Sequence, residues 1–145
     1  MIYFKPLTEQ YEWEWVKERT HVIRCEDTQG IVAYKKAEIQ AVCVADSFSP
    51  DSCNVHMAIG NPMVIRSGFL NEIGNHLFNV CSRSHIFGLV PATNERALKF
   101  DKHIGFTEVC RIPDGVGTGV DYIILRMNKR DCPWIQHNIK EEMAA

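Results

Sequence analysis

Short apolar runs alternate along the chain with longer stretches of helical periodicity. The runs are rich in β-branched and aromatic residues and are bounded by glycine, proline, asparagine or aspartate, which is typical of strands. They predict seven strands, at residues 2–5, 31–34, 39–44, 53–59, 85–90, 107–112 and 122–127. The second and third runs are joined by a short polar segment, which indicates an antiparallel hairpin.

The strand expected at residues 53–59 has two faces of different character, because side chains alternate across a strand. One face is expected to carry Val55, Met57 and Ile59. The other is expected to carry Asn54, His56 and Ala58.

Residues 8–19 are the first predicted helix. Acidic residues lie in its first turn, and Lys17 and Arg19 lie in its last, an arrangement that the helix dipole favours. We expect Tyr11, Trp15 and Val16 to face the interior. The aromatic residues of this helix are interpreted as packing residues.

A second helix is expected at residues 64–82, where Leu70, Ile73, Leu77 and Cys81 form an apolar stripe. Gly74 lies inside this stripe and costs up to about 1 kcal/mol relative to alanine.

A third helix begins at Thr93 or Asn94, either of which is a good N-cap, and Gly105 ends it. Its stripe consists of Ala97, Phe100 and Ile104.

The predicted order is β, α, β, β, β, α, β, α, β, β. Alternation of this kind predicts an α/β fold with a mixed sheet and helices on both faces, in a single domain over residues 1–145. The glycine-rich segment 113–121 precedes a strand, so it is interpreted as a mobile hairpin loop and not as a phosphate-binding turn. Residues 128–145 are expected to end in a charged helix.

Composition excludes several classes of function. A net charge of −2 gives no electrostatic footprint for nucleic acid or for an anionic membrane, and no apolar run is long enough to span a bilayer. The six cysteines form no Cys-x-x-Cys pair, and we interpret them as reduced packing residues. Since the N-terminal residues read as a strand and not as a leader, a cytoplasmic location is expected.

Five residues carry a resemblance to a known family. Asn94, Ala97, Phe100, Gly105 and Phe106 have the spacing Asn-x-x-Ala-x-x-Phe-x-x-x-x-Gly-Phe. This resembles the closing motif of the GNAT superfamily of acyl-CoA-dependent N-acetyltransferases, and the predicted order of elements is similar to the GNAT order. The family usually has two helices between its first two strands, whereas only one is predicted here. The abbreviated chain resembles GNAT proteins encoded by phages.

The resemblance implies an acetyl-CoA site. In the family, the pantetheine arm pairs with the end of the fourth strand where it splays from the fifth, which corresponds here to Met57, Ala58 and Ile59. It also implies that Asn94 hydrogen-bonds this arm and that Ala97 and Phe100 line its thiol end.

The pyrophosphate would meet the next loop and helix N-terminus, where unpaired N–H groups favour an anion. The corresponding residues are Arg66, Ser67, Gly68 and Phe69. This loop departs from the family pattern because it has one glycine, and a solvated Arg66 is as well supported as one bound to phosphate.

Acetyl transfer to an amine requires a base for the ammonium proton and an acid for the departing thiolate. His56 is the candidate base, and a hydrogen-bonded histidine in a sheet face is the alternative. Many relatives have an acidic tyrosine directly after the position of Phe100, but this chain has Asp101, which is ionised at neutral pH unless it is buried. The histidines and cysteines show no metal-ligand spacing, so no metal is expected.

We therefore expect an N-acetyltransferase that moves acetyl from acetyl-CoA to a primary amine on a small molecule or a protein. The acids Glu9, Glu12 and Glu14 of the first helix favour a cationic acceptor, although such a row is usually a solvated face. The alternatives are a catalytically inactive GNAT-fold binding or structural protein and a small-ligand sensor. An edge strand near the C-terminus is compatible with a homodimer.

Overall fold

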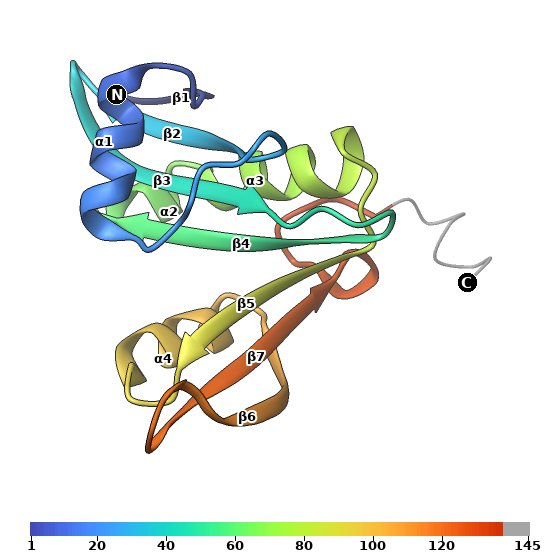
Figure 1. Ribbon diagram of the computed structural model, residues 1–145. Coiled ribbons are helices and arrows are strands. Elements are labelled where there is room, and N and C mark those ends of the chain that lie inside the picture. Colours follow the sequence, from blue (N-terminus) through green and yellow to red (C-terminus); the bar gives the residue numbers. More distant parts are fainter. Residues whose placement is uncertain (138–145) are drawn as a thin grey trace.

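One seven-stranded sheet, in the order β1-β2-β3-β4-β5-β7-β6, organises residues 1–137, which are the residues that the computed structural model describes (Figure 1). The strands are β1 (Ile2–Pro6), β2 (Gln29–Lys35), β3 (Glu38–Asp46), β4 (Ser52–Ile59), β5 (His85–Pro91), β6 (Thr107–Gly117) and β7 (Val120–Asn128). Every neighbouring pair is antiparallel except β4 and β5, which are parallel. The predicted mixed, mostly antiparallel sheet is confirmed.

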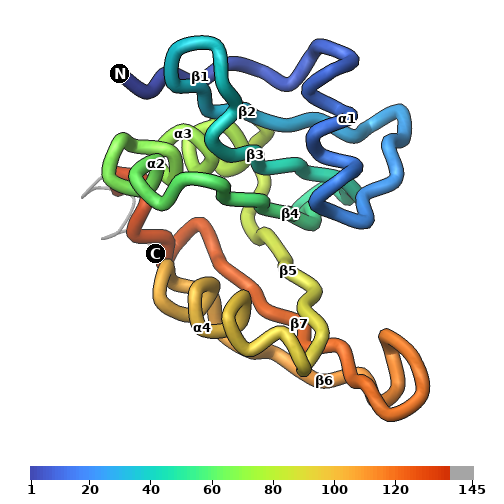
Figure 2. The backbone as a smooth tube through the Cα atoms, turned by 90° about the vertical axis from the view of Figure 1, so that its left-hand side faces the viewer, coloured from blue at the N-terminus to red at the C-terminus, as the bar shows by residue number. Residues whose placement is uncertain are grey.

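Helices cover both faces of the sheet, as expected (Figure 2). One face carries α1 (Gln10–Arg19). The other carries α2 (Met63–Arg66), α3 (Phe69–Gly74), the π-helix η1 (Asn75–Val80) and α4 (Glu95–His103), while a short 3₁₀ turn, η2 (Lys129–Asp131), follows β7. Among residues 1–137, α1 is the single helix between β1 and β2. No helix within this part of the chain is long and apolar enough to cross a membrane.

Two apolar cores follow from the alternation along the strands. Val32 and Val44 face α1 and pack with Trp13 and Val16, whereas the other face of β2 and β3 packs against α3 and η1 through Phe69 and its neighbours. Val55, Met57 and Ile59 belong to the second core and Ala58 to the first, so the two faces predicted for β4 are confirmed.

The inward face of α1 differs from the prediction. Tyr11 is exposed and Trp15 is half-buried, while Glu12, Trp13 and Val16 are buried. The pattern of apolar residues misplaced this face because the most deeply buried residue of the helix is Glu12, a carboxylate that is hydrogen-bonded to nearby groups.

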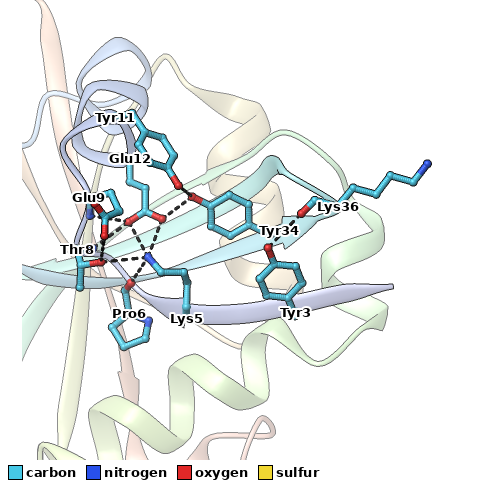
Figure 3. Close-up of polar contacts among 9 residues, drawn as sticks. All are labelled: Tyr3, Lys5, Pro6, Thr8, Glu9, Tyr11, Glu12, Tyr34 and Lys36. Atoms are coloured by element: carbon cyan, nitrogen blue, oxygen red, sulfur yellow. Dashed lines mark hydrogen bonds and ion pairs between the residues drawn. The ribbon is translucent and has the colours of Figure 1, made fainter.

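Glu12 is held by donors on three sides (Figure 3). Its carboxylate accepts from Lys5 Nζ at 2.7 Å and from the Tyr34 hydroxyl at 2.5 Å, and the backbone N–H groups of Thr8 and Glu9 donate to its Oε1. Burial alone would raise its pKa, but these hydrogen bonds outweigh burial and hold the pKa of Glu12 at about 2. The network fixes α1 to β1 and β2.

The single helix predicted at residues 64–82 is wrong. The chain instead forms α2, α3 and η1 in succession, with a break at Gly68. The φ of Gly68 is 95°, a left-handed backbone conformation that glycine adopts readily. Gly74 is also more than an interior weakness. A Cβ there would lie 2.9 Å from Ile135 Cγ2 and 3.3 Å from Trp134 Cβ. Because Gly74 has no side chain, the segment after η2 can pack directly against the helix.

The glycine-rich segment was also misjudged, since strands replace the expected loop. β6 continues to Gly117 and β7 resumes at Val120, which leaves a tight hairpin that projects from the body (Figure 2). Asp114 Oδ1 accepts from the N–H of Gly119, and Asp121 Oδ1 accepts from the N–H of Asp114, so two carboxylates close the turn. The charged C-terminal helix that was expected falls largely on residues 138–145, outside the described residues.

The cysteines are all free thiols in the structure. Cys43, Cys53 and Cys132 are buried, and burial raises the pKa of each thiol, to about 12 for Cys53. Cys25 and Cys110 are exposed, so the interpretation as packing residues holds for only part of the set.

The first prediction concerns the Glu12 network. The folded pKa of Glu12 lies below its ordinary value of 4.5, so its contribution to stability is present above that pH and is lost as the pH falls through about 2. Glu12→Gln should lower the free energy of unfolding at neutral pH by about 3 kcal/mol, measured by denaturant titration. Glu14→Gln, on the exposed side of the same helix, should change it by less than about 0.5 kcal/mol. Equal effects of the two variants would contradict a stabilising role for the network.

Candidate functional site

The site begins where β4 and β5 part. The two strands pair only from Ser52 to Asn54 against His85 to Phe87. Beyond that point β5 stays paired with β7 along its whole length, whereas β4 continues beside β3 alone, and the strands diverge (Figure 1). This splay leaves one edge of β4 without a neighbouring strand.

The register shows which backbone groups face the splay. The N–H of Gly60 bonds the carbonyl of Gln40, so the hydrogen-bonded pairs of the β3–β4 ladder are the even-numbered residues of β4. The N–H and C=O groups of Met57 and Ile59 therefore point away from β3, toward the gap. Such an edge can accept an extended, amide-bearing ligand.

A cavity of about 690 Å³ occupies the splay. Four groups of residues surround it: Val55 to Met57 and Ile59 of β4, Gly88 to Pro91 of β5, the inward face of α4, and the end of α1 at Arg19 with Thr20. Pro62, Ile65 and Phe106 complete the lining. The volume is in the range of small-molecule and cofactor sites.

The structure brings together seven of the residues proposed from sequence. The cavity is lined by His56, Met57, Ile59, Asn94, Ala97, Phe100 and Asp101. Ala58 lies on the same strand but packs toward the core under α1.

The proposed phosphate loop lies apart from this group. Arg66, Ser67, Gly68 and Phe69 are not among the residues that line the cavity. Arg66 and Ser67 are exposed at the junction of α2 and α3, and a Cβ at Gly68 would meet open space. Phe69 is fully buried and stacks on Phe4 with ring centroids 5.8 Å apart, so only its backbone is available to a ligand.

His56 is paired with a carboxylate that sequence reasoning missed. Its Nε2 lies 2.9 Å from Asp46 Oδ1, across the β3–β4 ladder, and both side chains are half-buried. Because a carboxylate accepts and does not donate, Nε2 carries the proton and the lone pair of the neutral ring lies on Nδ1. This pairing orients the imidazole.

Asp101 projects from α4 toward β5. Its Oδ2 lies 3.9 Å from the position that a Cβ of Gly88 would occupy, which places the carboxylate beside the backbone of β5. Among residues 1–137 its carboxylate has no hydrogen-bond or ion-pair partner. Burial raises the pKa of Asp101 from 3.8 to about 6. Asp101 therefore releases its proton at a pH closer to neutral than an exposed aspartate does.

Asn94 caps α4, since its Oδ1 accepts from the N–H of Ala97 at 3.2 Å. Asn94, Ala97 and Asp101 follow one another at three- and four-residue steps and so share one face of the helix. The amide nitrogen of Asn94 keeps its two donors for a ligand while the oxygen serves the cap.

Arg19 and Arg96 are lining residues that sequence reasoning missed, and they approach from opposite walls. Arg19 ends α1, and Arg96 lies in the first turn of α4. No local pattern marks either of them, because each reaches the cavity through the packing of its helix on the sheet. Glu9, Glu12 and Glu14, which had favoured a cationic acceptor, do not line the cavity.

Comparison with solved structures defines the fold. The spermidine/spermine N-acetyltransferase SpeG from Vibrio cholerae superposes with a TM-score of 0.72 at 10% identity, over 88% of this chain and 92% of that one. A GNAT-family protein from Desulfovibrio desulfuricans gives 0.70 at 14% identity, over 89% and 99%. The chain has the GNAT fold. The N-acetyltransferase PseH from Campylobacter jejuni gives 0.64 at 14% identity, over 88% and 98% of the two chains. No sequence model of a protein family matches this chain, and no curated protein sequence matches it significantly.

One of the SpeG structures contains manganese ions. Within residues 1–137 of the present GNAT-fold chain, no group of three or more histidine, cysteine, aspartate or glutamate side chains is placed to hold a metal ion.

The second prediction uses the raised pKa of Asp101. The folded state holds the Asp101 proton more tightly than the unfolded state, so the contribution to stability is present below pH 3.8 and is lost as the pH rises through about 6. Asp101→Asn should therefore raise the free energy of unfolding by about 2 kcal/mol at pH 7.5, with the gain shrinking as the pH is lowered to about 4. Denaturant titrations of both proteins at the two pH values measure this. A gain that is independent of pH would show that the carboxylate is not destabilised by its surroundings.

Proposed function

We propose that this protein is an N-acetyltransferase that moves the acetyl group of acetyl-CoA to a primary amine by direct attack. The observation that carries the proposal is a cavity in the β4–β5 splay with a carboxylate-paired histidine and a half-buried aspartate on its walls. The GNAT fold of N-acetyltransferases such as SpeG and PseH supports the same chemistry by analogy.

The donor would lie along the free edge of β4. The outward-pointing peptide groups of Met57 and Ile59 can pair with the two amides of the pantetheine arm, and the amide nitrogen of Asn94 can donate to it from the opposite wall. Ala97 and Phe100 then border the thioester. Arg96 is a better placed cation for the phosphates than Arg66, because Arg96 lines the cavity and Arg66 does not.

The reaction requires transfer of one acetyl group and movement of protons. His56 Nδ1 takes a proton from the ammonium group, and Asp46 holds the ring with Nδ1 free for this step. The neutral amine nitrogen then attacks the thioester carbonyl carbon, the C–N bond forms, and the C–S bond breaks as the nitrogen loses its second proton to water. The sulfur takes a proton from Asp101, and His56 and Asp101 return to their starting states by exchange with solvent. The products are an amide, CoA and one released proton.

Asp101 would supply the proton to the departing sulfur. A carboxylic acid with a pKa near 6 is a stronger acid than a thiol, whose ordinary pKa is about 8.5, so the transfer is downhill. Roughly a tenth of Asp101 is protonated at neutral pH, which is sufficient for general acid catalysis. A binding protein without catalysis has less support, because nothing in simple ligand binding calls for an unpaired, half-buried carboxyl group.

The third prediction tests the donor site. Acetyl-CoA should bind the purified protein with a micromolar dissociation constant, about 8 kcal/mol, measured by calorimetry. Asn94→Ala should weaken binding about tenfold or more through loss of the amide donor. Asn94→Ser, which keeps a capping oxygen, separates this effect from loss of the helix cap, and Thr93→Ala is the neighbouring control. Absence of acetyl-CoA binding would refute the proposed function.

The fourth prediction concerns the two ionisable groups. His56→Gln and Asp101→Asn should each lower kcat by about 10²-fold or more while the dissociation constant of acetyl-CoA stays within about threefold. In the wild type, kcat should fall as the pH rises through the pKa of Asp101 once the amine is saturating, and Asp101→Asn should remove that decline. His103→Gln, at the exposed end of the same helix, is the control. Turnover unchanged in His56→Gln would exclude the imidazole as the base.

A further inference from the structure

The two walls of the cavity differ in the ionisable groups that they present. Asp101 and Arg96 come from α4, on the side assigned to the donor. On the other side, His56 points from the face of β4 that packs toward α1, and Arg19 lies at the end of α1 itself. Arg19 and His56 therefore line the same side of the cavity.

Arg19 is held in a defined position with donors to spare. Its guanidinium lies 3.8 Å from the ring centroid of Trp15, and Nη1 donates to the Trp15 carbonyl at 3.2 Å and to Glu18 at 3.3 Å. Within residues 1–137, its Nη2 and Nε donate to no protein acceptor. The ion pair with Glu18 is largely exposed, at 42% and 73% of the two side chains, so it competes little with a ligand.

The acceptor wall also lacks the groups that bind cations. Among the lining residues the one acidic side chain is Asp101, on the opposite wall, while Asp46 is engaged by His56. On this side of the cavity a polyamine would bring further positive charge against Arg19 and next to His56. The substrate of SpeG thus does not fit this cavity by charge, although the folds are alike.

From these contacts we infer that the acceptor is a primary amine that also carries an anionic oxygen group, a carboxylate or a phosphate, and that Arg19 binds this group. The guanidinium fork matches the oxygens of either group in a two-point contact. Bound in this way, the anion anchors the molecule at the end of α1 and leaves its amine to reach His56. Arg19 is then a specificity-determining residue, and its role rests on the proposed acetyl transfer.

The test uses amines that share a two-carbon spacing and differ in the distal group: β-alanine, phosphoethanolamine, ethanolamine and ethylenediamine. Larger amines, namely α-amino acids, amino sugar phosphates, spermidine and a lysine peptide, extend the panel. With acetyl-CoA saturating, kcat/KM should be at least about tenfold higher for anionic than for neutral or cationic members, and the carboxylate and phosphate members distinguish the two anions.

Arg19→Gln should raise KM for the best anionic amine by about 10- to 100-fold with kcat nearly unchanged, and should leave neutral amines unaffected. Arg19→Lys should restore part of the loss, because it keeps the charge without the fork. Arg24→Gln is the matched control, since Arg24 also lies over a tryptophan, 4.4 Å from the Trp13 ring centroid, but does not line the cavity.

The outcomes separate this inference from the proposed function. A preference for cationic amines, an equal loss for all amines in Arg19→Gln, or acetyl-CoA binding with no acetylation of any anionic amine would each overturn the acceptor class. Failure of acetyl-CoA to bind would instead overturn the proposed function itself.

Discussion

The divergence of β4 and β5 is the constraint from which the site follows. Antiparallel pairing with β7 holds β5 along all seven of its residues, and the parallel contact with β4 ends after three. The gap exposes peptide groups of β4 that a continuous sheet would have satisfied, and such groups favour a partner that restores their hydrogen bonds. The same divergence gives α4 and the end of α1 access to a common space. The cavity thus follows from the pairing of β5 with β7 along its whole length and with β4 over only three residues.

Two carboxyl groups show how partners decide charge in this protein. Glu12 is fully buried, yet four donors around it keep it ionised. Asp101 is less deeply buried and has no such donors among residues 1–137, so its pKa is raised toward neutrality. Burial acts to raise the pKa of both groups. At Glu12 the hydrogen bonds outweigh burial, so the pKa of Glu12 is lowered instead. The first group serves the attachment of a helix, and the second remains available for proton transfer.

The sequence predicted what depends on local pattern. Alternation located the strands and the two faces of β4, and the spacing of Asn94, Ala97 and Phe100 located the helix that faces the cavity. Asp46 was missed because the third strand was expected to end at Val44 and no pairing with the fourth strand was predicted, whereas β3 runs to Asp46 and pairs with β4. Arg19 was missed because its position depends on how α1 packs, and the inward face of α1 was itself set by Glu12. The continuous helix at 64–82 failed because helical periodicity does not report a break at Gly68 or a neighbour at Gly74.

The close packing of residues 134 and 135 against Gly74 means that part of the core can form only late in synthesis. Trp134 and Ile135 fill the space beside this glycine, and Trp134 Nε1 donates to the carbonyl of Ile104 at the end of α4. The core under α3 and α4 therefore lacks a wall until the chain has been synthesised through residue 135. On the ribosome, the β1–β4 half with α1 has its partners early, whereas the half that carries Asp101 must wait for residues near the end of the sequence.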